Sequence, residues 1–298
     1  MKVWKVIGAS VLSLAFTAAI LLFDIKDLPA GCSIAGVILG LILPDLWHFI
    51  QDLWDTTNWK SSQRKLKRGG FIKDDTIIRI SFAYLYRIKV GNKYLLVKNS
   101  RNTGKYQPVG GVYKLQREEK LELKNLYHVM DDDKIHIDKS SQNDYRLRME
   151  NRYLRKFMSR FDSQMAKRER IENVGREFKE ELIETRILNW DKISYRYCGR
   201  FMTDLKFGEH FQIYELLLAD IVELIPTVEQ ECDLKILMSK ESNDYCFVTA
   251  EKIKSLGTDI EAEDLNERIG DHTRKILQEE EGQLIKMPGT GDVYTIEL

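Results

Sequence analysis

The chain is poor in cysteine and proline, and it has no excess of charge of either sign. Its 298 residues include 4 cysteines and 5 prolines, and 46 basic residues balance 46 acidic ones. The four cysteines form no C-x-x-C pair and no zinc-type spacing, so the sequence indicates neither a disulfide scaffold nor a structural zinc site. Balanced charge gives no global attraction to nucleic acid, and we expect no DNA or RNA polymer as a partner.

Two long apolar runs lie at the amino terminus. Residues 6–23 carry no charge over 18 positions, and residues 28–44 carry none over 17. A helix rises about 1.5 Å per residue, so the first run, and the second with its flanks, can cross a hydrocarbon core of about 30 Å. We predict a transmembrane helical hairpin over 1–54, with spans at about 4–23 and 30–50. The first run could instead be a cleaved signal peptide, and the second a buried core helix.

The basic residues around these runs predict an orientation. Lys2 and Lys5 precede the first run, and residues 55–73 after the second form a basic juxtamembrane linker. The short connecting loop carries one basic residue, Lys26. Because basic flanks stay in the cytoplasm, we expect a multi-pass membrane protein, in contact with membrane lipid, with both termini cytoplasmic.

Small residues recur in the second run. Cys32, Gly36 and Gly40 lie four positions apart. Close approach of helices in lipid uses small residues at this period. The ladder could pack the two helices of the hairpin together or join copies in a homo-oligomer, and the sequence does not choose between these roles.

Beyond residue 73 the pattern is that of alternating strands and helices. Segments 77–90 and 94–99 predict a strand pair across Gly91-Asn92, a strong hairpin signal. Further elements are predicted as strands at 193–202 and 211–222, followed by the segment 246–253 and a helix over 265–277.

The segment between these strands is long and charged. Within 112–167, residues 118–139 predict a surface loop or edge hairpin, and residues 145–165 predict a helix. That helix has a basic side, which could supply guanidinium groups to phosphates or could be an ordinary solvated face.

Four carboxylates follow at helical spacing. Glu177, Glu180, Glu181 and Glu184 fall at i, i+3, i+4 and i+7, on one side of a predicted helix whose apolar side includes Phe178. Hard cations take oxygen ligands. We therefore take Glu177, Glu180 and Glu181 as candidate Mg²⁺ ligands.

The segment 176–181, Arg-Glu-Phe-Lys-Glu-Glu, resembles the core of the Nudix box, and 105–111 resembles the strand end that opens it. The box has a Glu eight positions before its Arg, where this chain has Arg168, and a Gly where it has Ile183. The resemblance implies an α/β fold, a Nudix-like αβα sandwich with a mixed sheet, over 74–298 with 112–167 as an insertion. The altered positions favour ligand binding over hydrolysis.

With its hairpin, the chain resembles the two-transmembrane effectors with a SMODS-associated Nudix-like domain from bacterial cyclic-oligonucleotide anti-phage signalling (CBASS). This resemblance implies a sensor that binds a cyclic di- or oligonucleotide made by a CD-NTase, assembles as a homo-oligomer and disrupts the inner membrane in abortive infection. The alternative is a membrane-tethered Nudix hydrolase acting on a nucleoside diphosphate derivative with Mg²⁺. A protein-binding membrane scaffold is a third reading.

The ligand is expected at the glycine pair of the strand end. A missing Cβ at Gly110 and Gly111 lets phosphates approach the backbone closely. Tyr106 could stack on a base, whereas Arg176 could simply pair with Glu180 and orient the helix. The expected ligand-binding residues are Lys98, Arg101, Lys105, Tyr106, Gly110, Gly111 and Arg176.

Overall fold

The computed structural model describes residues 2–54, 58–99, 104–134, 141–258, 267–277, 284–287, 290–291 and 293–298. The chain divides into two compact units, Met1–Gly69 and Gly70–Leu298.

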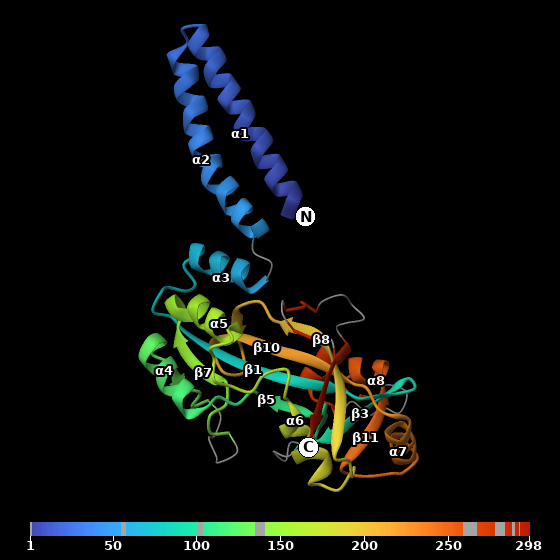
Figure 1. Cartoon of the computed structure of the whole chain (residues 1–298). Helices are drawn as coiled ribbons and strands as arrows, with labels where there is room; N and C mark the ends of the chain where they lie inside the picture. Colours follow the sequence, from blue (N-terminus) through green and yellow to red (C-terminus); the bar gives the residue numbers. More distant parts are fainter. Residues whose placement is uncertain are drawn as a thin grey trace. The chain divides into compact units, whose positions relative to one another are not determined.

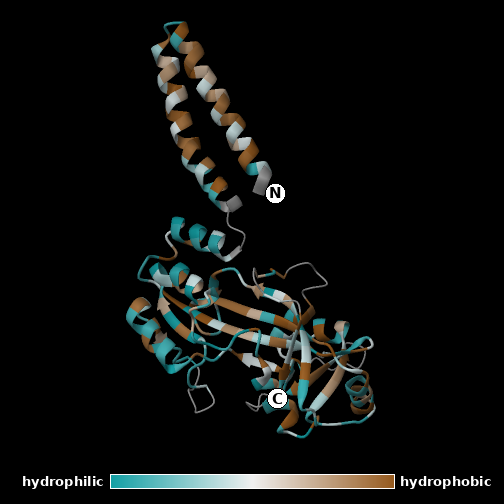
Figure 2. Ribbon diagram, in the orientation of Figure 1, coloured by the Kyte–Doolittle hydropathy of each residue, from teal (hydrophilic) through white to brown (hydrophobic). Residues whose placement is uncertain are grey.

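The first unit contains two long apolar helices, α1 (Lys2–Ile25) and α2 (Pro29–Trp54). Their apolar segments have mean hydropathies of 2.4 and 1.7, and both are long and apolar enough to cross a membrane (Figure 2). The turn between them places Asp27 at φ 51°, a left-handed conformation that Asp tolerates. Two apolar helices at the predicted spans are confirmed. Which side of a membrane each end faces stays a prediction.

Two of the three small residues in the ladder of α2 border open space. A Cβ built on Gly36 or Gly40 would meet no atom within 4 Å. Cys32 does reach α1, with its thiol 3.5 Å from the Ile20 carbonyl, and Gly31 lies against the Phe23 ring. Gly36 and Gly40 therefore leave an open surface. Of the two roles that the sequence left open, packing within the hairpin applies to Cys32 and not to these two glycines.

A third helix, α3 (Asn58–Arg68), occupies the segment predicted as a basic linker. Its last turn carries Lys65, Lys67 and Arg68. Cations at a helix carboxyl terminus interact favourably with the helix dipole, which helps to explain why this charged segment is helical.

The second unit is built on a mixed sheet with strand order β12-β8-β10-β1-β7-β6, with β5 added to β1 and β9 added to β10 (Figure 1). The pairing of β1 with β10 is parallel, and the other pairings are antiparallel. The strands are β1 (Ile77–Arg87), β5 (Gly110–Val112), β6 (Met130–Asp131), β7 (Arg146–Glu150), β8 (Lys192–Met202), β9 (Lys206–Gly208), β10 (Ile213–Leu224) and β12 (Val293–Glu297).

A smaller sheet has the order β11-β3-β2, with β4 added to β3. Its strands are β2 (Lys89–Val90), β3 (Lys93–Lys98), β4 (Tyr106–Gln107) and β11 (Tyr245–Thr249). The predicted hairpin at Gly91-Asn92 joins only β2 and β3, with Gly91 at φ 60°. β1 belongs to the larger sheet, so the expected single strand over 77–90 is wrong after Arg87. The predicted strands at 193–202 and 211–222 are confirmed as β8 and β10.

Helices flank the two sheets (Figure 1). Their bounds are α4 (Arg117–Tyr127), η1 (Asn151–Tyr153), α5 (Leu154–Asp162), α6 (Gly175–Phe178), η2 (Lys179–Ile183), α7 (Val228–Met238), α8 (Ala250–Lys254) and η3 (Asp271–Leu277). The mixed sheet with flanking helices confirms the predicted fold class.

The two faces of β1 have different partners. Phe82 packs on the α5 rings of Phe157 and Phe161, with ring centroids 6.0 and 4.8 Å away. On the other face, Leu85 joins a second core shared with the smaller sheet, which also contains Leu96 and Ile276. Alternation along the strand thus divides β1 between an aromatic core and a face that is only partly covered.

The insertion differs from its prediction in two places. A helix, α4, forms where a surface loop or hairpin was expected, and β7 replaces the first part of the predicted helix at 145–165. β7 pairs with β1, and this long-range pairing overrides the local helical pattern. On α5, Arg160 bonds Glu119 at 3.0 and 2.8 Å, so this member of the basic side joins two helices.

The helix predicted over 265–277 is also shorter than expected. Only Asp271–Leu277 is helical among its described residues, and it is a 3₁₀-helix. Residues 259–266 lie outside the part of the chain that the structure describes.

Candidate functional site

A cleft of about 720 Å³ lies over the partly covered face of the large sheet. Its floor includes Ser81 and Ala83 of β1 and Ala219 of β10. These side chains are small, so the sheet is hollowed at its centre. The volume lies in the range of roughly 300–1,000 Å³ that ligand pockets usually have.

One wall of the cleft is the carboxylate helix. It begins as α6 and continues as a π-helical turn, η2, so it is not one regular α-helix as predicted. Phe178 and Leu182 are fully buried, whereas Glu177, Glu180 and Glu181 line the cleft. The predicted separation of an apolar side from a carboxylate side is confirmed. Single π-turns occur frequently at functional sites.

The carboxylates meet the glycine pair of β5. The Gly110 N–H donates to Glu181 Oε2 at 3.0 Å. A Cβ built on Gly111 would lie 1.9 Å from Glu177 Oε1, so only glycine leaves that carboxylate in its present position. Gly110 has φ 144° and passes so close to β1 that a Cβ would lie 2.3 Å from the Tyr84 carbonyl oxygen. The two glycines therefore fix the distance between the strand and the carboxylate helix.

Burial and mutual repulsion change how these acids titrate. Burial and the charges of the neighbouring Glu177 and Glu180 together raise the pKa of Glu181 to about 8. Burial also raises the pKa of Glu177, against the lowering effect of Arg176. Crowded, partly desolvated carboxylates of this kind gain from a cation or a hydrogen-bond donor in the cleft.

Arg176 lies at the centre of an ionic network. It donates to Glu169 through Nε at 2.7 Å and Nη2 at 3.2 Å, to Glu177 at 2.6 Å and to the Val112 carbonyl at 3.0 Å. Its ion pair with Glu180 is longer, at 3.6 Å. Arg176 thus ties the segment before the box to the helix and to β5.

The box position that the sequence assigns to Arg168 is filled in space by the next residue. The Arg168 guanidinium lies 3.8 Å from the centre of the Phe161 ring, away from Arg176. Glu169 supplies the acidic partner instead, one residue later. Arg168 therefore does not by itself argue against turnover. Of the two altered box positions, only Ile183 still favours binding over hydrolysis.

The predicted Mg²⁺ ligands do not form a ready-made cage. Among the described residues, no group of three or more His, Cys, Asp or Glu side chains is arranged to hold a metal ion. Glu177 is paired with Arg176, and Glu181 accepts from Gly110. The residues as placed do not fit a three-carboxylate site, and Mg²⁺ bound to Glu177, Glu180 and Glu181 stays a prediction.

The structure brings together some of the predicted ligand residues and separates the others. Gly110, Gly111 and Arg176 line the cleft. The remaining described residues of the set, Lys98, Lys105 and Tyr106, do not line it. Their strands, β3 and β4, belong to the smaller sheet.

Each of these separated residues is placed by contacts of that sheet. Lys105 pairs with Glu267 at 2.7 Å, and the Tyr106 hydroxyl donates to the Asn243 carbonyl at 3.1 Å. Tyr106 therefore lies outside the cleft, and its stacking on a ligand base stays a prediction. Lys98 is exposed at the end of β3, and Arg101 lies outside the described residues.

Sequence reasoning missed five basic residues of the cleft. Strand alternation along β1 could have indicated Arg79, whose register neighbours Ser81 and Ala83 form the floor. The others reach the cleft through long-range pairing that no local pattern shows. The five are Arg79, Lys114, Arg146, His272 and Lys275.

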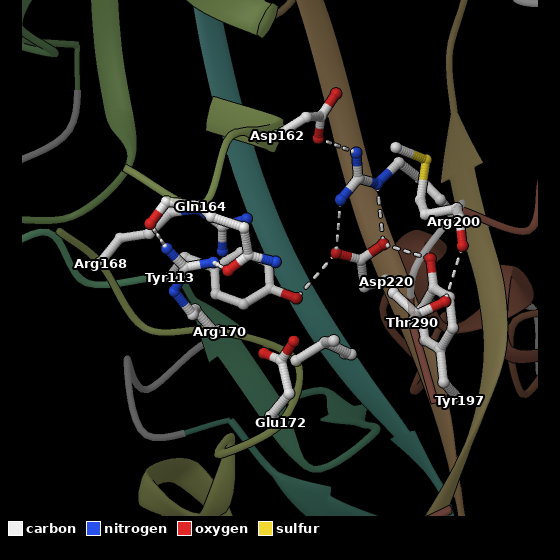
Figure 3. A pocket seen from close by; sticks show the side chains of 12 residues that line it. Tyr113, Asp162, Gln164, Arg168, Arg170, Glu172, Tyr197, Arg200, Asp220 and Thr290 are labelled. Carbon is white, nitrogen blue, oxygen red and sulfur yellow. Dashed lines mark hydrogen bonds and ion pairs between the residues drawn. The ribbon is translucent and has the colours of Figure 1, made fainter. Parts of the chain in front are cut away.

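A second, smaller cavity of about 60 Å³ lies within the unit and is lined by a network of polar groups (Figure 3). Asp220 accepts from Arg200 at 2.8 and 3.0 Å, from the Tyr113 hydroxyl at 2.7 Å and from the Tyr197 hydroxyl at 3.1 Å. Arg200 also donates to Asp162 at 2.6 Å. The buried Arg200 and Asp220 are thus paired with each other, and the network joins β8 and β10 to the exposed Asp162 at the end of α5.

Comparison with known proteins identifies the family of the chain. No curated protein matches the chain. A crystal structure of a UDP-X diphosphatase is similar over 92% of this chain and 96% of that one, at 12% identity and a TM-score of 0.25, a likeness too low to carry an argument. A family model described as the SMODS-associated NUDIX domain matches residues 77–277, more than half of the chain. The chain therefore belongs to the SMODS-associated NUDIX domain family.

Proposed function

We propose that this protein is a membrane-anchored effector of CBASS antiviral defence. Its Nudix-like domain binds a cyclic di- or oligonucleotide made by a CD-NTase, and its helical hairpin then disrupts the inner membrane, which arrests growth or kills the cell. Membership of the SMODS-associated family and the two apolar helices support this proposal.

The observation that carries the sensing step is the cleft over β1. Its floor of Ala83, Leu217 and Ala219 is apolar, and its walls carry groups of both signs. A cyclic nucleotide has flat bases and anionic phosphates, and it needs both kinds of surface. The cleft offers both within one volume of about 720 Å³.

In this proposal, ligand binding acts on the hairpin by promoting the assembly of several copies of the chain. A ligand shifts an equilibrium only by its differential affinity for the two states, so the nucleotide must bind an oligomer more tightly than the monomer. We therefore place the homo-oligomer on the activated side of the equilibrium.

One observation favours a second candidate, a Nudix hydrolase acting on a nucleoside diphosphate derivative with Mg²⁺. Glu169 gives Arg176 an acidic partner, and Glu177 and Glu181 lie against the Gly110-Gly111 turn. The box helix therefore contacts both its acidic partner and the glycine turn, although its C-terminal position holds Ile183 in place of glycine.

Binding and product release by the full-length protein distinguish the candidates. The chain in lipid nanodiscs is titrated with a panel of cyclic di- and trinucleotides, and phosphorus NMR follows product release with Mg²⁺ present. Binding without release supports the sensor. Turnover abolished by Glu180→Gln or Glu181→Gln establishes the hydrolase. A panel without binding or turnover leaves the scaffold reading.

The membrane step is tested in cells. The full chain, co-expressed with a cyclic-nucleotide synthase, should depolarise the inner membrane and arrest growth, and reporters fused to either terminus should behave as cytoplasmic. If the membrane stays polarised in cells where the protein has bound the nucleotide, the protein is not a membrane-damaging effector.

A further inference from the structure

The second wall of the cleft carries a lysine in an unusual setting. Lys275 of η3 lines the cleft, and its ammonium group lies 5.7 Å from the centre of the Phe201 ring. Within the described part of the chain it has neither an ion pair nor a hydrogen bond. Burial lowers its pKa, although Asp271 and Glu215 act in the opposite direction. A partly desolvated cation without a direct counter-ion costs stability unless an anion comes to it.

The other cations of the cleft are already neutralised by protein carboxylates. Arg79 pairs with Asp132 at 2.7 Å and with Glu215 at 3.1 Å. Lys114 and Arg146 both pair with Asp144. With Arg176 held by Glu169 and Glu177, Lys275 is the one cleft cation, among the residues that the structure describes, without a carboxylate in contact.

The position of η3 is fixed by the strand that leads into the glycine turn. Ile269 forms a parallel bridge with Tyr106, and the Gly270 N–H donates to the Tyr106 carbonyl at 2.8 Å. The buried Ile276 anchors the other end in the core. The wall that carries Lys275 is therefore held in register with Gly110, so its distance from the carboxylate helix is set by the fold.

His272 stands one turn before Lys275 in the same wall. A 3₁₀-helix has three residues per turn, so positions 272 and 275 share a side. Burial and the charge of Lys275 lower the pKa of His272 to about 4, which keeps its ring neutral near pH 7. A neutral imidazole offers one hydrogen-bond donor and one acceptor, the pattern that a base edge or a ribose hydroxyl can match.

From this arrangement we infer that Lys275 is the phosphate-binding residue of the cleft and that His272 beside it recognises the base or ribose of the same nucleotide. This inference rests on the proposed function and adds the residues that hold the ligand. It places the phosphate against η3, opposite the carboxylates, where negative charge would meet the least repulsion.

The test uses the full-length chain in nanodiscs and four proteins: wild type, Lys275→Met, Lys275→Arg and Lys235→Met. Lys235 is an exposed lysine of α7, paired with Glu231 at 2.7 Å and outside the cleft, so it controls for the loss of a lysine. The probes are the tightest-binding cyclic dinucleotide and inorganic pyrophosphate, and the readouts are Kd and the thermal midpoint of the unliganded protein.

Lys275→Met should weaken cyclic dinucleotide binding about ten-fold or more, because hydrogen bonds to charged groups are among the stronger ones. Lys275→Arg should recover most of the affinity, and Lys235→Met should leave it unchanged. The midpoint of unliganded Lys275→Met should equal or exceed that of wild type, since a costly charge is removed. A fall of several degrees would assign Lys275 to the fold and overturn the inference, as would an unchanged affinity.

Pyrophosphate separates this inference from the proposed function. If no cyclic nucleotide binds wild type, the sensing proposal fails, and pyrophosphate decides the role of Lys275. Pyrophosphate binding that Lys275→Met weakens supports a phosphate site at this residue. Its absence in wild type, or its persistence in Lys275→Met, refutes that site.

Discussion

Glu169 and Arg176 hold each other through two hydrogen bonds, Nε to Oε1 at 2.7 Å and Nη2 to Oε2 at 3.2 Å. Glu169 Oε2 also accepts from the Lys114 N–H at 2.8 Å. One carboxylate thus joins the end of the insertion, the start of the box helix and the segment after β5. The pair thus lies where the start of the box helix meets the strand that carries Gly110 and Gly111.

Removing the Glu169 charge should destabilise the domain. Glu169→Gln loses part of a bidentate, half-buried pair, and we expect a loss of about 1–3 kcal/mol in the free energy of unfolding. Hydrogen exchange of the β1 and β10 amides measures it. Glu184→Gln, an exposed acid at the end of the same helix, is the matched control and should change little. Equal values for the two variants would mean that the pair has no structural role.

The two glycines should respond differently to alanine. In Gly110→Ala the new methyl meets the Tyr84 backbone oxygen, which cannot move aside, so we expect a loss of about 1–3 kcal/mol. In Gly111→Ala the clash is with the end of the Glu177 side chain, which can rotate away. Gly111→Ala should therefore lower stability less than Gly110→Ala does, and it should lower ligand affinity more. Thermal midpoints and Kd values of both variants check this, and the reverse order would place the ligand elsewhere.

The sequence could predict the elements whose signal is local. The apolar runs of α1 and α2, the strands β8 and β10, and the buried side of the box helix that includes Phe178 all follow from composition and period. The glycine pair 110–111 was also recognisable, because it stands just before the insertion in a strand-end motif. These parts supply the carboxylate wall of the site.

What the sequence could not predict depends on long-range geometry. Counting positions assigns the acidic box position to Arg168, but Arg168 stacks on Phe161 and Glu169 takes its place. The placement of Tyr106 outside the cleft follows from the pairing of β4 with β3 in the smaller sheet, which no local pattern shows. Lys275 has no motif around it, and only the fold shows that it faces the cleft without a carboxylate.

The pH dependence of stability should reveal Glu181. Its pKa rises from an ordinary 4.5 to about 8 in the folded protein, so the folded state keeps a proton that the unfolded chain releases between these values. Its contribution is fully present below pH 4.5 and is lost as the pH rises through 8. Glu181→Gln should flatten this part of the profile, measured by hydrogen exchange of β1. An unchanged profile would show that Glu181 is ionised throughout.

The same carboxylate tests the Mg²⁺ prediction. A metal ion binds ionised Glu181, so Mg²⁺ should stabilise the protein above the Glu181 pKa more than below it. At ten times its Kd the gain would be about 1.4 kcal/mol. Ca²⁺ is the control for the identity of the ion, and Glu181→Gln is the control for its binding site. Equal stabilisation of wild type and Glu181→Gln would place the ion at another site.

Acid should act on the opposite wall through His272. Its pKa is lowered from 6.5 to about 4, so the unfolded chain gains a proton between these values and the folded protein does not. The His272 contribution is therefore present above pH 6.5 and is lost as the pH falls toward 4. His272→Gln should remove this loss, whereas the same change at the exposed His210 should not. Thermal midpoints across the range test it, and equal acid sensitivity of both variants would contradict the burial of His272.

The open glycines of α2 predict how the hairpin acts. A Cβ at Gly36 or Gly40 meets no atom within 4 Å, so leucine at both positions should leave the hairpin folded and inserted. If close contact with a second copy is needed to damage the membrane, because small residues let helices approach in lipid, Gly36→Leu with Gly40→Leu should abolish toxicity. Gly31→Leu is the contrasting variant, since it clashes with the Phe23 ring and should disturb the hairpin itself.

Cell growth, membrane insertion and nucleotide affinity together separate the outcomes of this last experiment. Lost toxicity with normal insertion and unchanged Kd would show that the Gly36 and Gly40 surface joins copies and that joining is the damaging step. Loss of membrane insertion would instead show that Gly36 and Gly40 are needed for the hairpin to fold. If the double variant inserts normally and remains fully toxic, assembly does not depend on the surface that the two leucines block. The helices α1 and α2 would then serve only as an anchor.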